Sequence, residues 1–173
     1  MTNTLGYEVI TQAIPKDLAQ KAANALLKQP KRAREKYDAF EIPPVCLAVR
    51  DEFIKNTDKN ALVRIFHPKP VPSQPDHIFA GIFRETEADP KKLKTAEKGE
   101  VYATIALTPL SSLNGWYTFY EGSRANQSAP DDTTPTAALS LEVGDVVVWR
   151  GDLIYFHSPG GGGMFQTIVY KNR

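Results

Sequence analysis

From residue 101 onward the chain is a succession of short β-type segments, and this pattern constrains the fold more than any other feature. The segments are rich in β-branched and aromatic residues and read "VYATIAL", "WYTFY", "LSLEV", "VVVW", "DLIYFH" and "MFQTIVY". Turn signals separate them, among them Asn114-Gly115, Gly144-Asp145, Gly151-Asp152 and the glycine run 160–163. Many short strands without intervening helices are typical of a β-sandwich or barrel.

The N-terminal part has a mixed pattern. "GYEVI" predicts a short strand, and Leu18, Ala22, Ala25 and Leu26 recur at the spacing of an amphipathic helix that ends at Pro30. A second helix is predicted over residues 31–41, and "VCLAV" and "ALVRIF" are interpreted as strands.

The middle of the chain is interrupted by a proline-rich segment, "HPKPVPSQPD", which predicts an extended loop. "HIFAGIF" follows as a predicted strand, and the polar residues 84–100 are interpreted as a surface excursion. We therefore predict a single domain over residues 1–173, with a helical part at about 1–60 and a β part at about 61–170.

Composition excludes several classes of protein. The net charge of +1 over 173 residues gives no electrostatic basis for binding nucleic acid or an anionic membrane. No apolar run reaches the ~20 residues of a membrane span, and the N-terminus lacks a signal-peptide pattern, so we expect a cytoplasmic protein. The single cysteine, Cys46, lies in the apolar stretch "PPVCLAV", which indicates a buried thiol and excludes a disulfide framework.

Three features in the same order resemble a known family. They are "GYEVI" followed by an amphipathic helix, then "ATIALTPLSSLNGWYTFYEGSR", and then "LEVGDVVVWRGDLIY". Together they resemble the phytanoyl-CoA dioxygenase-like branch of the Fe(II)/2-oxoglutarate-dependent oxygenases. The resemblance implies a mainly β fold, a double-stranded β-helix (a cupin-like jelly roll) with N-terminal helices.

The family's chemistry sets requirements that can be checked residue by residue. The resemblance implies a His-x-Asp/Glu pair and a distal histidine that bind Fe(II), together with a cation, usually arginine, that pairs with 2-oxoglutarate. Neither His67 nor His77 has a carboxylate two positions later. His77 is in the expected neighbourhood, but Glu85 is eight residues further on.

The distal positions also depart from the family pattern. Aligned on "WRGDLIY", the position of the distal histidine is occupied by Tyr155, and His157 follows two residues later. Because side chains alternate along a strand, Tyr155 and His157 should face the same way, into the barrel and beside the glycine run. Gln166 occupies the position where the resemblance implies a cation.

We therefore predict an oxygenase-like protein that has lost iron and 2-oxoglutarate binding and needs no cofactor. It should bind a small, largely apolar molecule, with a non-oxidative isomerisation or cyclisation as its candidate reaction. Two alternatives stay open: an active dioxygenase using Fe(II), 2-oxoglutarate and the atypical ligands His77, Glu85 and His157, or a non-catalytic partner of an active paralogue. A homodimer and a cupin-type epimerase are further options.

The candidate site residues follow from this reading. Tyr155 and His157 are the candidate catalytic pair, and His157 is expected to titrate near neutrality. The candidate substrate-binding residues are Tyr102, Trp116, Phe119, Trp149, Gln166 and Arg84.

Overall fold

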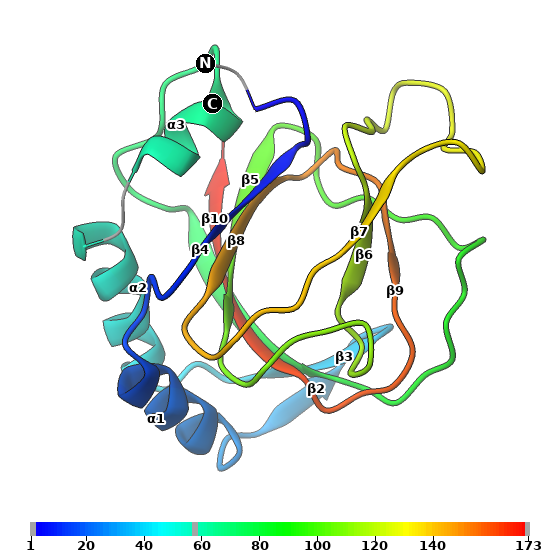
Figure 1. Ribbon diagram of the computed structural model, residues 1–173. Coiled ribbons are helices and arrows are strands. Elements are labelled where there is room, and N and C mark those ends of the chain that lie inside the picture. The colour runs from blue at the N-terminus through cyan, green and yellow to red at the C-terminus, as the bar shows by residue number, and fades with distance from the viewer. Residues whose placement is uncertain (1–2, 57–58, 172–173) are drawn as a thin grey trace.

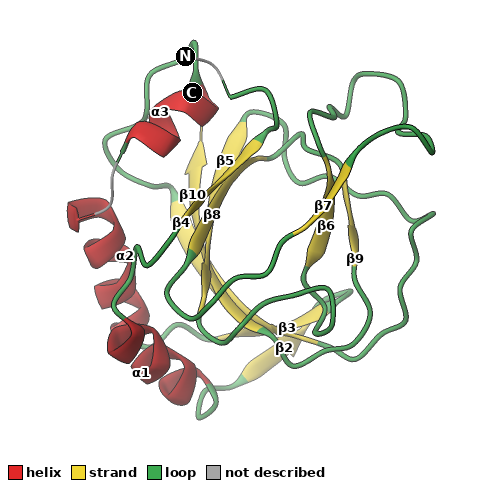
Figure 2. Ribbon diagram, in the orientation of Figure 1, coloured by secondary structure: helices red, strands yellow, loops and turns green. Residues whose placement is uncertain are grey.

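The computed structural model describes residues 3–56 and 59–171. In this part of the chain two β-sheets face each other, and three helices cover the outer side of the larger sheet (Figures 1 and 2). The predicted fold class, a double-stranded β-helix with helices near the N-terminus, is confirmed.

The larger sheet has seven strands, and every neighbouring pair is antiparallel. In spatial order the strands are β1 (Tyr7–Ile10), β8 (Val146–Arg150), β5 (Glu100–Ala106), β10 (Met164–Lys171), β4 (His77–Phe83), β3 (Tyr37–Phe40) and β2 (Lys31–Ala33). Strand β1, near the N-terminus, therefore lies beside β8, which comes from the C-terminal half of the chain.

The smaller sheet contains β7 (Thr136–Ala138), β6 (Tyr117–Tyr120) and β9 (Tyr155–His157). Segment 84–100 does not leave the barrel as a simple surface excursion. It runs beside β9, with isolated bridges between Thr86 and Gly160 and between Lys94 and Tyr155. This segment therefore extends the smaller sheet and lies next to the interior.

Strand alternation separates two cores. One face of the larger sheet packs against the helices through residues such as Ala103, Val148 and Ile168. The other face looks towards the smaller sheet and carries aromatic residues such as Tyr102 and Trp149. Successive side chains of a strand point to opposite faces of the sheet. A sheet that buries both faces therefore needs strands that are apolar along their whole length, and β5, β8 and β10 come close to this.

The helices are α1 (Lys16–Leu26), α2 (Pro44–Asn56) and α3 (Asn60–Phe66). The strands predicted for "VCLAV" and "ALVRIF" are wrong, since these segments belong to α2 and α3. In α2 the buried residues Cys46, Val49 and Phe53 follow helical spacing. The short apolar run that suggested a strand is thus part of a longer helix, of which one side is buried.

The helix predicted over residues 31–41 is also wrong. This segment forms β2 and β3, and β3 pairs with β4. Its charged residues suit an edge position, where side chains face water and discourage association with other strands. The strand predicted for "LSLEV" is reduced to one bridge between Leu110 and Leu141, and β7 lies just before it.

The turn between Glu142 and Val146 fastens the start of the chain to the barrel. Asp145 is buried and accepts hydrogen bonds from the backbone N–H groups of Gln12, at 2.8 Å, and of Glu142, at 2.9 Å. Gly144 has a φ of +92°, and a Cβ there would lie 2.2 Å from the carbonyl oxygen of Ile14. In the "GD" turn, the close backbone approach and the positive φ therefore require the glycine, and the aspartate supplies the buried hydrogen-bond acceptor.

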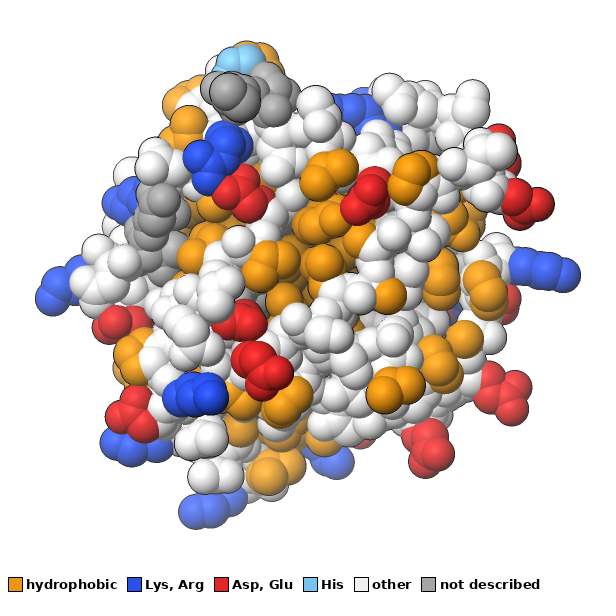
Figure 3. All heavy atoms as spheres, in the orientation of Figure 1, with side chains coloured by type: hydrophobic (Ala, Val, Ile, Leu, Met, Phe, Trp, Pro, Cys, Tyr) orange, Lys and Arg blue, Asp and Glu red, His pale blue; other side chains and the backbone are white. Residues whose placement is uncertain are grey.

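The surface gives two further observations. On the face seen in Figure 3, hydrophobic side chains gather near the centre, between the two sheets. Within residues 3–56 and 59–171, no helix combines the length and apolar character needed to cross a bilayer.

Candidate functional site

A cavity of about 330 Å³ lies between the two sheets. Most of its lining side chains come from the inward faces of the strands, and it is closed on one side by residues of segment 84–100. The lining residues are Tyr37, His77, Phe79, Ala96, Glu97, Glu100, Tyr102, Thr104, Trp116, Tyr117, Trp149, Tyr155, Phe165 and Thr167. This volume falls at the lower end of the range of small-molecule sites.

Aromatic rings form most of the wall and hold one another in place. Tyr117 stacks on Tyr155 with ring centroids 4.1 Å apart, and on Trp116 at 4.5 Å. Across the cavity, Tyr102 stacks on Trp149 at 4.7 Å. Such pairs add about 0.5–1.5 kcal/mol each beyond the area they bury, so the stacking stabilises the wall.

A small polar group lies among these rings. The hydroxyls of Thr104 and Thr167 are 3.0 Å apart on adjacent strands, and the indole N–H of Trp149 donates to Thr104 Oγ1 at 3.1 Å. Thr104 and Thr167 are both almost fully buried. The network fixes the indole and gives an otherwise apolar wall two hydroxyl groups.

Charged groups are confined to one end of the cavity. Glu97 and Glu100 line it there, and Glu100 accepts a hydrogen bond from the hydroxyl of Tyr102. His77 is also at this end, with its Nδ1 2.8 Å from Asp76 Oδ2. The cavity therefore has an aromatic interior and a polar, acidic rim.

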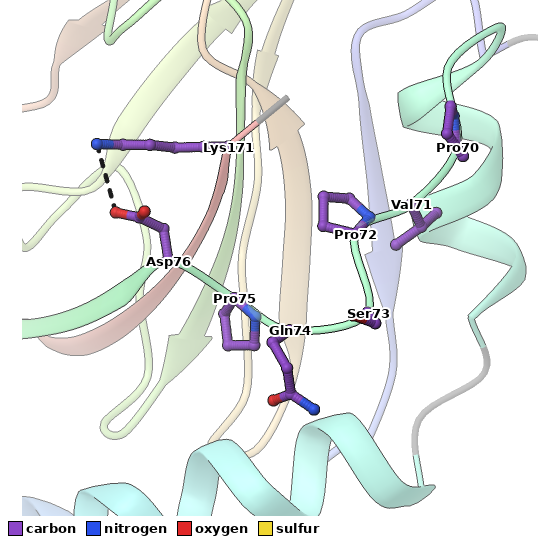
Figure 4. A pocket seen from close by; sticks show the side chains of 8 residues that line it. All are labelled: Pro70, Val71, Pro72, Ser73, Gln74, Pro75, Asp76 and Lys171. Carbon is purple, nitrogen blue, oxygen red and sulfur yellow. Dashed lines mark ion pairs between the residues drawn. The ribbon is translucent and has the colours of Figure 1, made fainter. Parts of the chain in front are cut away.

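Lys171 lies just outside this rim. Its ammonium is 3.3 Å from Asp76 and 3.8 Å from Glu100. Figure 4 shows the side chain reaching across to Asp76 beside an open hollow of about 430 Å³, which is formed with the proline-rich loop 70–75. The lysine is thus shared between two carboxylates.

The phenols of the wall stay protonated at neutral pH. Burial raises the pKa of Tyr155 to about 12, and it raises the pKa of Tyr117 well above its usual value. The pKa of Tyr102 is raised by burial and by its hydrogen bond to Glu100. These hydroxyls can donate hydrogen bonds but cannot act as anionic bases near pH 7.

His157 is buried on the same strand face as Tyr155, as predicted from the alternation, with its ring centroid 5.8 Å from that of Tyr155. It packs behind Tyr117 and against Phe83, and it does not line the cavity. Burial lowers the pKa of His157 to about 4, so the expectation that it titrates near neutrality is not met. A neutral imidazole in an apolar environment supports the shape of the wall.

The other predicted residues divide into two groups. Tyr102, Trp116, Trp149 and Tyr155 line the cavity. Phe119, Gln166 and Arg84 do not.

Each of these three has a visible reason for its position. Phe119 is fully buried and packs edge to face behind Tyr117. Gln166 points towards the helices, because it alternates with the inward-facing Phe165 and Thr167, and it donates to the carbonyl of Cys46 at 2.8 Å. Arg84 follows β4 and donates to the carbonyl of Arg34 on the exposed side.

The sequence reasoning missed the polar lining residues. Glu100 and Thr104 share the parity of Tyr102 within "EVYAT", and this signal could have placed both on the inward face. Glu97 gives no such signal. It lies in a segment without periodicity, and only the path of that segment beside β9 brings it to the cavity.

The glycine run is also not where it was expected. The open end of the barrel was expected beside residues 160–163, but none of these glycines lines the cavity. Gly160 and Gly161 instead pack closely against the backbone of Leu113 and Arg84.

Comparisons with known proteins agree with this architecture. No family model matches the sequence, and no curated protein matches it. Several solved structures match over nearly the whole chain.

The non-heme alpha ketoglutarate dependent carbocyclase SnoK from nogalamycin biosynthesis is 15% identical, with a TM-score of 0.70 over 98% of this chain and 80% of that chain. The epimerase SnoN from the same biosynthesis is 12% identical, with a TM-score of 0.71 over 98% of this chain and 77% of that chain. HygX from Streptomyces hygroscopicus, with nickel and 2-oxoglutarate bound, is 13% identical, with a TM-score of 0.65 over 97% and 83%.

The chain has the fold of the 2-oxoglutarate-dependent oxygenases. At these identities the likeness establishes the fold alone, so the chemistry of the site has to be judged from this chain's own residues.

Those residues do not fit the iron of an oxygenase. Across residues 3–56 and 59–171, no three side chains of the histidine, cysteine, aspartate and glutamate types come together in a way that could hold a metal. The alternative ligands are separated: His77 begins β4, Glu85 follows its far end, and His157 is buried behind Tyr117. Eight residues of strand correspond to about 26 Å.

The residues that line the cavity do not fit 2-oxoglutarate either. This cosubstrate carries two carboxylates, whereas among residues 3–56 and 59–171 the acidic side chains that line the cavity are Glu97 and Glu100, and no lysine or arginine lines it. Like charges at short range in a partly buried site repel. The candidate site is thus an aromatic pocket on an oxygenase fold.

Proposed function

We propose that the protein binds a small, largely apolar molecule in the cavity between its sheets, without iron or 2-oxoglutarate. The supporting observation is the cavity lining itself, in which eight aromatic side chains surround a pair of threonine hydroxyls. Apolar cavities with a few convergent polar groups are the usual form of a small-molecule site. Flat, mostly apolar ligands suit such a wall because they can stack on its rings.

The proposed reaction is a redox-neutral isomerisation or cyclisation. SnoK and SnoN are a non-heme alpha ketoglutarate dependent carbocyclase and epimerase, so this fold can host ring closure and epimerisation, there with a cosubstrate that the proposed reaction does not use. In this chain Tyr155 is the group best placed to act, since it lines the cavity and remains a proton donor at neutral pH.

Tyr155 would donate a hydrogen bond to an oxygen of the ligand and keep its proton, while a rim carboxylate, Glu97 or Glu100, would accept a proton from carbon. The same proton returned to a different carbon completes an isomerisation without any oxidant. His157 is a positioning residue in this scheme, because it packs against Tyr117, whose ring stacks on that of Tyr155.

The binding proposal can be tested with tryptophan fluorescence. The chain has two tryptophans, and both line the cavity, so fluorescence changes report on this site. Chelator-treated protein titrated with β-naphthol, a flat and largely apolar probe, should show saturable quenching. Ala96→Trp should abolish the binding by filling the cavity, as measured by calorimetry to avoid the added fluorophore.

The matched control is Ala88→Trp, an exposed position in the same segment that does not line the cavity. It should leave the affinity for β-naphthol unchanged. Equal binding in both variants, or no saturable binding to the wild type, would contradict the proposed function.

The catalytic part is tested by hydrogen exchange. In D₂O the protein should accelerate incorporation of deuterium into β-tetralone, a flat ketone with acidic α-hydrogens. Tyr155→Phe should reduce the acceleration about 10²–10⁴-fold, the range typical of a general acid or base. Acceleration unchanged in a folded Tyr155→Phe protein would remove Tyr155 from the scheme.

A further inference from the structure

The cavity combines two features that together specify the charge of its ligand. Its interior is made of aromatic rings, and the carboxylates that line it in the described part of the chain, Glu97 and Glu100, lie at one end. We propose that the cavity selects organic cations, in which an apolar body carries an ammonium or quaternary ammonium group. This inference rests on the proposed function, because it names the ligand class of the same cavity.

The rings supply the first part of the argument. Aromatic faces carry negative potential, and a cation within about 6 Å of a ring centroid is attracted to it, most strongly to Trp and next to Tyr. Both tryptophans and four tyrosines line the cavity, and apart from Trp116, which directly precedes β6, they lie on strands of both sheets. A cation inside would therefore face rings on several sides.

The phenols strengthen this preference. Burial keeps Tyr117 and Tyr155 protonated, so the interior itself carries no charge that would compete for the cation or repel an apolar body. A quaternary ammonium suits this environment because it needs no hydrogen-bond acceptor, and its weak hydration makes transfer from water less costly than for a small ion.

The rim supplies the second part. The charged groups that face it are Glu97, Glu100, Asp76 and Lys171, with His77 beside Asp76. Lys171 is shared between Asp76 and Glu100 and offsets one of the three carboxylates. Even with Lys171 and His77 both counted as cations, the three carboxylates leave the rim a net negative charge, which attracts cations and repels dicarboxylates.

The test uses pairs of probes that differ only in charge. One pair is choline and its neutral isostere, in which carbon replaces nitrogen. The other is para-hydroxyphenyltrimethylammonium and para-tert-butylphenol. Titrated against the wild-type protein with tryptophan fluorescence as the readout, the cation of each pair should bind at least tenfold more tightly than its neutral partner.

Two variants locate the effect. Glu97→Gln and Glu100→Gln should each weaken the cations several-fold and leave the neutral probes unchanged, since the amide keeps the size of the side chain and removes its charge. Glu87→Gln, which changes an exposed carboxylate of the same segment outside the lining, should change neither. Added salt should weaken the cations in the wild type more than in Glu97→Gln.

The outcomes separate this inference from the proposed function. Neutral probes that bind as tightly as their cations, or tighter, would overturn the selection for cations and leave the binding proposal standing. Failure of all four probes to bind would overturn both. Cation binding that persists at full strength in Glu97→Gln and Glu100→Gln would place the recognition outside this cavity and overturn the inference.

Discussion

The rings of Tyr117 and Tyr155 stack with their centroids 4.1 Å apart and an interplanar angle of 26°. Tyr155 occupies the position at which the resemblance to oxygenases implies the distal iron ligand. By that resemblance, a phenol stands where a metal-binding imidazole is expected, and the interior of the barrel around it is lined by packed aromatic rings.

This stacking predicts energetic coupling between the two rings. The double variant Tyr117→Leu, Tyr155→Leu should cost less than the sum of the two single variants, by about 0.5–1.5 kcal/mol, because each single variant already loses the ring contact. Urea unfolding of the four proteins measures the coupling, and additive effects would show that the rings do not interact.

The threonine pair gives a second prediction. Thr104→Val preserves the shape of the side chain but leaves the buried indole N–H of Trp149 and the hydroxyl of Thr167 without their shared partner. We expect a loss of about 1–3 kcal/mol in the free energy of unfolding. Thr104→Ser keeps the hydroxyl and is the matched control. A smaller loss for valine than for serine would contradict the network.

His157 should make stability depend on pH. Its pKa is about 4 in the folded protein and about 6.5 in the unfolded chain, so the unfolded state binds more protons between these values. Its contribution to stability is therefore present above about pH 6.5 and is lost as the pH falls towards 4, by up to about 3 kcal/mol.

The measurement compares wild type with His157→Gln in urea at pH 5 and pH 7.5. The variant should lose less stability on acidification than the wild type, because it lacks the group that must be protonated on unfolding. The same pH dependence in both proteins would indicate that His157 is not buried in its neutral form.

Asp145 fastens the residues that follow the first strand to the barrel. Asp145→Ala removes two backbone hydrogen bonds to a buried carboxylate and should cost about 2–3 kcal/mol. Asp132→Ala, at an exposed position, should cost almost nothing. Comparable unfolding midpoints for the two variants would mean that the turn is held by other contacts.

Much of the barrel could be predicted because its strands are bounded by clear signals. "HIFAGIF" lies between a proline-rich loop and a charged segment, and β4 has the same bounds. The segments that became α2 and α3 were misassigned because their apolar runs are too short to distinguish a strand from one stripe of a helix. The hairpin at 31–40 depends on pairing with β4, which is a contact between distant parts of the chain.

A residue of the site could be predicted where the alternation of side chains along a strand decides which way it faces. Tyr155, Tyr102 and Trp149 face the cavity as their alternation indicates. Gln166 was assigned by its spacing in the resemblance, but its parity places it on the helix side, where it meets Cys46. The acidic rim was missed because Glu97 reaches it through the tertiary path of a segment that has no pattern of its own.

The central claim is that this fold binds its ligand without iron or 2-oxoglutarate, and the thermal melting of the protein under anaerobic conditions with Fe(II) and 2-oxoglutarate tests it most directly. A native-state ligand at a hundred times its dissociation constant contributes about 2.7 kcal/mol. For a chain of this size that corresponds to a rise of about 5–11 °C in Tm. We predict no rise over the protein treated with chelator alone. A rise of several degrees that requires both Fe(II) and 2-oxoglutarate, and that a chelator reverses, would contradict the account.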